Sequence, residues 1–119
     1  MSSIRATMGA MATFAVVTTK GPNWNRDVGI RDQAGWDAHA GFADGLVAHG
    51  TTVLGGPIET GDPEVVALLL VNAEDEREVR DAFAADPWAA SGILRYGAVY
   101  PWTLWLDSRS QPLGAEHGA

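Results

Sequence analysis

Hydrophobic and polar positions alternate along the first part of the chain, and an unbroken apolar run follows further on. Residues 12–19 alternate with a period of two, so that Phe14, Val16 and Thr18 share one face of an expected strand. Residues 65–71 are apolar throughout, which predicts a strand buried on both faces. Both segments are therefore predicted to be strands that contribute to the core.

Two shorter segments complete the expected set of strands. Residues 51–54 combine threonine with valine and leucine, and the Gly-Gly-Pro sequence at 55–57 predicts a tight turn after them. Residues 94–106 form the last expected strand, in which Pro101 belongs at an edge, a bend or a bulge. Four strands are thus expected in all.

A helical period of 3.6 residues appears between residues 33 and 49. At about 100° per residue, one side of this helix is apolar and carries Trp36, His39, Ala40, Phe42, Ala43, Leu46 and Val47. The helix is expected to begin between Asp27 and Asp32 and to end at Gly50, a left-handed C-terminal cap. His39 is therefore a titratable side chain in the middle of a buried stripe.

Two further helix starts are marked by capping residues. Asn72 with Asp75 three positions later resembles a capping pair, and it opens an amphipathic segment. Asp86 is a suitable N-cap and Pro87 a suitable first helical residue for a short helix that Gly92 would end. Asp86 therefore has a structural interpretation of its own, as a helix cap.

The expected order is strand, helix, strand, strand, helix, strand, which is the α+β, ferredoxin-like (split βαβ) arrangement. Two helices can cover only one face of a four-stranded sheet. The other face also carries apolar side chains, so we expect a homodimer or a higher oligomer to bury it.

Composition limits the classes of partner. The 119 residues, 46% of them hydrophobic, suit one domain, expected over residues 12–107 between a lead-in of residues 1–11 and a flexible tail of residues 108–119. The net charge is −7 and Lys20 is the only lysine, so nucleic acid and anionic membranes are poor partners. The chain has no cysteine, which excludes disulfides and thiolate metal sites and favours a cytoplasmic location.

Motifs for metals, nucleotides and nucleophiles are missing from the sequence. It contains no His-Glu-x-x-His, no phosphate-loop pattern and no Gly-x-Ser-x-Gly. His39 and His49 stand about 15 Å apart along a helix, too far to share a metal. His49 falls on the polar side of the helix, and His117 lies in the tail. We therefore expect chemistry without a cofactor.

The order of several short motifs is similar to that of a known family. The motifs are Trp36, His39, Gly50, Gly55-Gly56-Pro57, Asp86-Pro87-Trp88 and Pro101-Trp102. Over residues 12–106 the chain resembles the YCII-related family of small dimeric α/β-barrel proteins. The resemblance implies a ferredoxin-like protomer whose sheets pair in a dimer, with His39 and Asp86 as a catalytic His–Asp pair.

The same resemblance bounds the chemistry. Some members carry out acid–base reactions on small organic molecules, and one type is a dehydrochlorinase of chlorinated hydroxyquinols. In such a pair, Asp86 would accept a hydrogen bond from one ring nitrogen of His39 and leave the other nitrogen to move a proton. The structural alternative is a hydrogen-bonded core histidine.

Aromatic residues and a glycine are candidates for binding a planar substrate: Trp24, Trp36, Gly56, Trp88 and Tyr96, with Tyr100 as a further aromatic. Each aromatic side chain has core or dimer packing as its alternative role, and a tight turn is the alternative for Gly56. Two functions stay open at this stage. One is a lyase or isomerase of a small aromatic or polyketide-like molecule, and the other is a non-catalytic small-molecule-binding or interaction module. A cofactor-independent oxygenase rests only on analogy with other dimeric α/β barrels.

Overall fold

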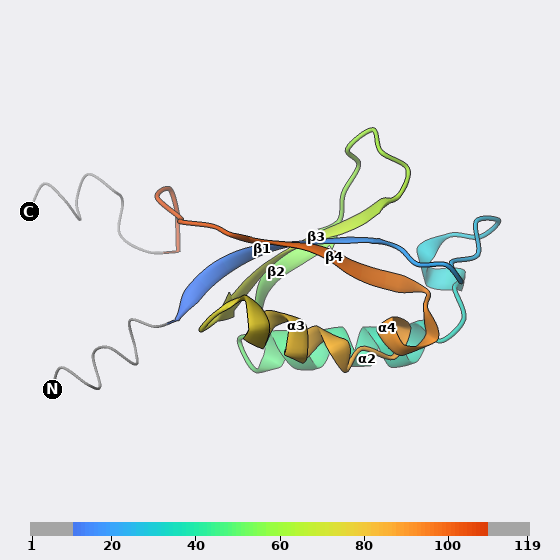
Figure 1. Ribbon diagram of the computed structural model, residues 1–119, viewed down its shortest axis with the longest axis horizontal. Coiled ribbons are helices and arrows are strands. Elements are labelled where there is room, and N and C mark those ends of the chain that lie inside the picture. Colours follow the sequence, from blue (N-terminus) through green and yellow to red (C-terminus); the bar gives the residue numbers. More distant parts are fainter. Residues whose placement is uncertain (1–10, 110–119) are drawn as a thin grey trace, which may run out of the picture.

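Four antiparallel strands form one sheet in the order β2-β3-β1-β4, and three helices pack against it (Figure 1). The computed structural model describes residues 11–109. Its elements are β1 (Ala12–Lys20), the 3-10 turn η1 (Ile30–Asp32), α2 (Trp36–Ala48), β2 (Thr52–Pro57), β3 (Val65–Ala73), α3 (Glu76–Ala84), α4 (Pro87–Ser91) and β4 (Leu94–Pro101). This order and this pairing confirm the predicted α+β, ferredoxin-like arrangement. The expected lead-in and the expected tail lie almost entirely outside the described residues.

The helices all lie on one face of the sheet, and the main core lies beneath them (Figure 1). β1 is central, and its Val16 is paired with Leu69 of β3 and Val99 of β4. Phe14, Val16 and Thr18 share one face, as the alternating pattern predicted, and all three are buried. Phe14 and Val16, with Val71 of β3 on the same face, form one core cluster with Val79 and Phe83 of α3.

The opposite face of the sheet is not covered by any helix within residues 11–109 (Figure 1). Leu54 is 56% exposed, Tyr100 57% and Trp102 43%. The prediction that residues 65–71 are buried on both faces is therefore wrong for a single chain, in which only Leu70 and Val71 of this run are buried. One chain offers nothing in its described part to cover the second face.

The first helix begins later than its hydrophobic period predicted. α2 starts at Trp36, and only the short η1 turn forms in the region where we expected the start. Gly35, with φ of 76°, adopts the left-handed conformation just before the helix. The side chain of Gln33 is buried and bonds both the N–H and the C=O of Asn25, which ties the preceding loop down in a non-helical path.

The predicted Gly-Gly-Pro turn is instead the second half of β2. Gly55 pairs with Leu69, and a Cβ on Gly55 would stand 2.4 Å from Leu69 Cδ2. The glycine is thus needed for the close approach of two strands and not for a turn. The last strand also differs from its prediction, because β4 ends at Pro101 and not at residue 106. A proline is tolerated there since β4 is an edge strand.

The helix after β3 is capped by a different residue than the sequence suggested. Asp75, not Asn72, is the N-cap, and its carboxylate accepts a hydrogen bond of 2.9 Å from the Glu78 N–H. Asn72 remains in β3, where it pairs with Thr13. Within residues 11–109, no helix has the length and apolar character needed to cross a membrane.

Candidate active site

His39 lies on the side of α2 that faces the sheet. The apolar stripe of α2 is half-buried, because its side chains keep part of their surface exposed: Trp36, His39, Phe42 and Leu46. Val47, which the period placed on the buried side, is 55% exposed and lines the open space beside this helix. The helix therefore leaves open space between its stripe and the sheet.

Asp86 meets His39 from the start of α4. The Nδ1 atom of His39 lies 3.0 Å from Asp86 Oδ1 and 2.9 Å from Asp86 Oδ2. The Asp86 side chain is fully buried, whereas that of His39 is 13% exposed. An ionised carboxylate can only accept hydrogen bonds, so this contact places a proton on Nδ1 and leaves Nε2 with its lone pair.

Two more donors hold the Asp86 carboxylate in place. The Tyr96 hydroxyl donates to Oδ2 at 2.5 Å and the Trp88 N–H donates to Oδ1 at 2.9 Å. Burial works against ionisation of Asp86. The hydrogen bonds from His39, Tyr96 and Trp88 outweigh it and hold the pKa of Asp86 below its usual value. Burial, together with the bond to Asp86, raises the pKa of Tyr96, so this hydroxyl stays protonated as a donor.

The predicted cap at Asp86 is confirmed together with the contact to His39. The Trp88 N–H bond is the capping bond of α4, Pro87 occupies the first turn, and Gly92 ends the helix in the left-handed conformation with φ of 77°. One carboxylate therefore both starts a helix and orients an imidazole.

Trp88 lies behind the imidazole and not on an open wall. Its ring stacks on that of His39 with centroids 3.9 Å apart and planes 6° apart. The indole N–H donates to the Ala34 carbonyl at 2.7 Å, and the side chain is buried. Trp24 packs edge-on against Trp88 with centroids 6.1 Å apart, in agreement with the alternative in which Trp24 lies on the core. Trp88 thus supports the imidazole of His39, and Trp24 in turn packs against Trp88.

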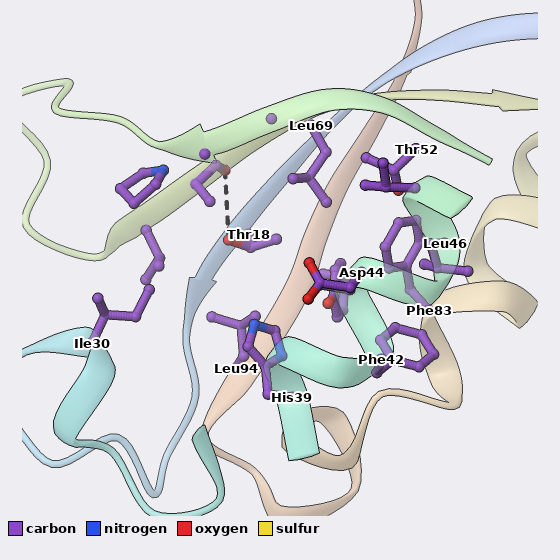
Figure 2. Close-up of a pocket in the computed structure, with 18 of the residues that line it drawn as sticks. Thr18, Ile30, His39, Phe42, Asp44, Leu46, Thr52, Leu69, Phe83 and Leu94 are labelled. Atoms are coloured by element: carbon purple, nitrogen blue, oxygen red, sulfur yellow. Dashed lines mark hydrogen bonds between the residues drawn. The ribbon is translucent and has the colours of Figure 1, made fainter. Parts of the chain in front are cut away.

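A cavity of about 310 Å³ opens between α2 and the sheet, and His39 lies at its wall (Figure 2). Of the predicted substrate-binding residues, Trp36, Gly56 and Tyr96 line it, whereas Trp24 and Trp88 do not. Most of the wall is apolar, with contributions from Ile30, Phe42, Leu46, Val66, Leu69, Phe83 and Leu94. The space suits a small, mainly apolar molecule with a few polar groups.

The cavity also has polar lining residues that the sequence did not single out. Asp44 follows His39 by five positions and projects toward the cavity in Figure 2, although the helical period placed it on the polar side. Arg31 of η1 lines the cavity as well. Arg31 reaches the cavity because the segment before α2 is a non-helical loop, and the sequence pattern did not predict that loop.

The other histidines stand apart from this site. His49 is exposed, as predicted, and its Nδ1–H donates to the Gly45 carbonyl at 2.9 Å. His117 lies outside the described residues. Within residues 11–109, no group of three histidine, cysteine, aspartate or glutamate side chains is placed to hold a metal ion.

A histidine oriented by a buried aspartate, at the wall of a small apolar cavity in a ferredoxin-like domain, defines a candidate acid–base site. The chain belongs to the YCII-related family: residues 12–103 match the family's YCII-related domain. No curated protein matches the chain by sequence.

One solved structure shares this fold over most of its length. It is the 5-chloro-2-hydroxyhydroquinone dehydrochlorinase of Burkholderia phenoliruptrix AC1100, in complex with 2,5-dihydroxybenzoquinone. The TM-score is 0.56 at 24% identity, and the match covers 76% of this chain and 93% of that one. At this identity the similarity establishes the fold and leaves the reaction to be argued from the site.

Proposed function

We propose that the protein is a cofactor-free acid–base enzyme of the lyase or isomerase type, with His39 as the catalytic base. The observation that carries this proposal is the bond from His39 Nδ1 to the fully buried Asp86 carboxylate at the wall of a cavity. Since the proton on Nδ1 is fixed by that bond, Nε2 is the atom that takes a proton from the substrate. Asp86 does not line the cavity, so it acts as a positioning residue through His39.

The reaction type follows from a single positioned base. Where Nε2 of His39 removes a proton from a carbon next to a carbonyl, the electron pair left behind expels a leaving group from the neighbouring carbon as its anion, which is an elimination. Where Nε2 removes a proton from a ring hydroxyl, the electron pair forms the carbonyl and the imidazolium returns the proton to a ring carbon, which is an isomerisation. A base held in this way contributes roughly 10²–10⁴-fold to the rate.

The proposed substrate is a small aromatic or polyketide-like molecule. The cavity is of the right order for one ring, and its walls are mainly apolar. The similar solved structure, which is a dehydrochlorinase of a hydroxylated ring, supports the same class of substrate by analogy of fold.

The proposed assembly is a cytoplasmic homodimer. The uncovered sheet face exposes Leu54, Tyr100 and Trp102, and exposed apolar surface of this kind is typical of an interface. Pairing two such faces would make the dimeric α/β barrel that the family resemblance implies.

The test is turnover by purified protein of 5-chloro-2-hydroxyhydroquinone and of a panel of halogenated or hydroxylated rings, followed by chloride release and ultraviolet absorbance. His39→Gln is expected to lower the rate roughly 10²–10⁴-fold while the fold is retained. His49→Gln is the matched control and should leave the rate unchanged. If ring compounds bind in the cavity but none is converted, the alternative of a non-catalytic binding module replaces the enzyme.

A further inference from the structure

Within residues 11–109, Arg31 is the one arginine or lysine among the side chains that line the cavity. It comes from η1, and its guanidinium carbon lies 5.9 Å from the ring centroid of Trp36, a neighbour on the same wall. A guanidinium offers up to five N–H donors in a planar fork that matches a carboxylate or a phenolate. Arg31 thus brings a permanent positive charge to the wall of this cavity.

The donors of Arg31 are not committed to another side chain. Within residues 11–109, Arg26, Arg77, Arg80 and Arg109 each form an ion pair with a carboxylate. Arg31 and Arg95 form none there, although the chain carries 15 acidic and 8 basic residues, and of these two arginines Arg31 is the one that lines the cavity. An exposed arginine in so acidic a chain is therefore left with its hydrogen-bonding capacity for water or a ligand.

A negatively charged side chain, that of Asp44, lines the same cavity at a different place. Among the described residues Asp44 is the only acidic one that lines the cavity, and it stands about 12 Å further along α2 than Trp36. In Figure 2, Ile30 of η1 and Asp44 lie on either side of His39. A ligand that spans the cavity would meet a cation near η1, the base in the middle and a hydrogen-bond acceptor at the far end.

We infer that Arg31 and Trp36 form an anion-binding end of the cavity, and that the substrate is a planar ring with an ionised oxygen substituent at that end and a hydroxyl group toward Asp44. The inference rests on the proposed function, since it names the substrate class of the same site. Arg31 binds the ionised oxygen and Trp36 lies beside the ring. Asp44 accepts from the hydroxyl, and the reacting carbon is held near Nε2 of His39.

Binding alone tests this inference, without turnover. The probes are two pairs of ring compounds of similar shape, each with one hydroxyl group: 4-hydroxybenzoate with 4-hydroxybenzamide, and 3-hydroxybenzoate with 3-hydroxybenzamide. Calorimetric titration of the full chain should show each anion binding about tenfold more tightly than its neutral counterpart, the order expected for a charge-assisted hydrogen bond. The preference should fall as salt is added.

Arg31→Gln should abolish the preference and leave the affinity for the neutral compounds unchanged. Arg31→Lys should keep part of it, because the charge remains but the planar fork is lost. Arg26→Gln is the matched control: Arg26 lies in the same loop but pairs with Glu64 and does not line the cavity. Equal affinity within both pairs, no binding of any probe, or a preference that survives Arg31→Gln would overturn the inference. A preference that depends on Arg31 in a protein without turnover would instead count against the proposed function alone.

Discussion

Replacing Asp86 by asparagine separates the charge of this residue from its shape. Asparagine is as good an N-cap as aspartate, so its remaining oxygen can still accept from the Trp88 N–H and start α4. The amide nitrogen then occupies the place of the oxygen that accepts from Tyr96 and His39. The Tyr96 hydroxyl can rotate to accept. Nδ1 of His39 also lies 3.0 Å from the oxygen that stays, but that oxygen is now neutral and an amide N–H stands at the closer position, which favours a lone pair at Nδ1. Its proton is therefore expected to move to Nε2, the atom that should act as the base.

The cost in stability follows from the bonds that change. Two charge-assisted hydrogen bonds, from His39 and from Tyr96, become neutral ones, and bonds to charged groups contribute more than neutral bonds by roughly 1 kcal/mol each. The free energy of unfolding should thus fall by about 2 kcal/mol at neutral pH. Because the Asp86 pKa is lowered in the folded state, this stabilisation is present above the unfolded-state pKa of about 3.9 and is lost as the pH falls through the folded-state value. The gap between the two proteins should narrow below about pH 4.

Urea unfolding followed by tryptophan fluorescence measures the stability difference. Nitrogen-15 NMR of the imidazole rings measures the tautomer, with the His39 signals identified by their loss in His39→Gln. Asp44→Asn is the control, because Asp44 is an exposed carboxylate on the same cavity, and it should change stability by less than about 0.5 kcal/mol. An unchanged His39 tautomer in Asp86→Asn would refute the assignment of Asp86 as the residue that orients the imidazole.

Three further outcomes are expected. Light scattering at micromolar concentration should report twice the chain mass, and a monomer that persists would contradict the burial of the second sheet face. Gly55→Ala should lower the free energy of unfolding by about 1–3 kcal/mol, because the new Cβ meets Leu69. In Gly56→Ala the new Cβ has no atom within 4 Å, so thermal unfolding should show almost no change in stability. Tyr96→Phe removes one donor to Asp86, so the folded-state pKa of Asp86 should rise. In urea titrations at a series of pH values, the loss of stability in acid should then begin at a higher pH than in the unaltered protein. An unchanged pH dependence of stability below neutral pH would count against that hydrogen bond.

Local patterns in the sequence were enough to find each member of the central pair, but not the pair itself. His39 stands out because it interrupts an apolar helical stripe, and Asp86 because it precedes proline at a helix start. The two lie 47 positions apart, and only tertiary structure brings them together. The family resemblance suggested the pairing before the fold was known.

The features that the sequence did not reveal depend on contacts between distant segments. Gly55 reads as a turn residue, and it becomes a strand residue because β3 requires a close approach at Leu69. Trp88 follows Asp86 by two positions in the sequence. Its ring nevertheless lies behind His39, where the indole N–H donates to the Ala34 carbonyl. Closeness in sequence to a site residue therefore does not predict whether a side chain lines the cavity or packs behind it.

The double role of Asp86 has an evolutionary consequence. This carboxylate supports the start of α4 whether or not any reaction takes place. The His39 side chain, within residues 11–109, forms no hydrogen bond to the backbone of another element. Selection for a folded protein alone would therefore retain Asp86, which accepts from three donors, more strongly than His39, which contributes one of them. Descendants of such a chain that become pure binding proteins are thus expected to lose the histidine first, with the aspartate left behind as a trace of the former activity.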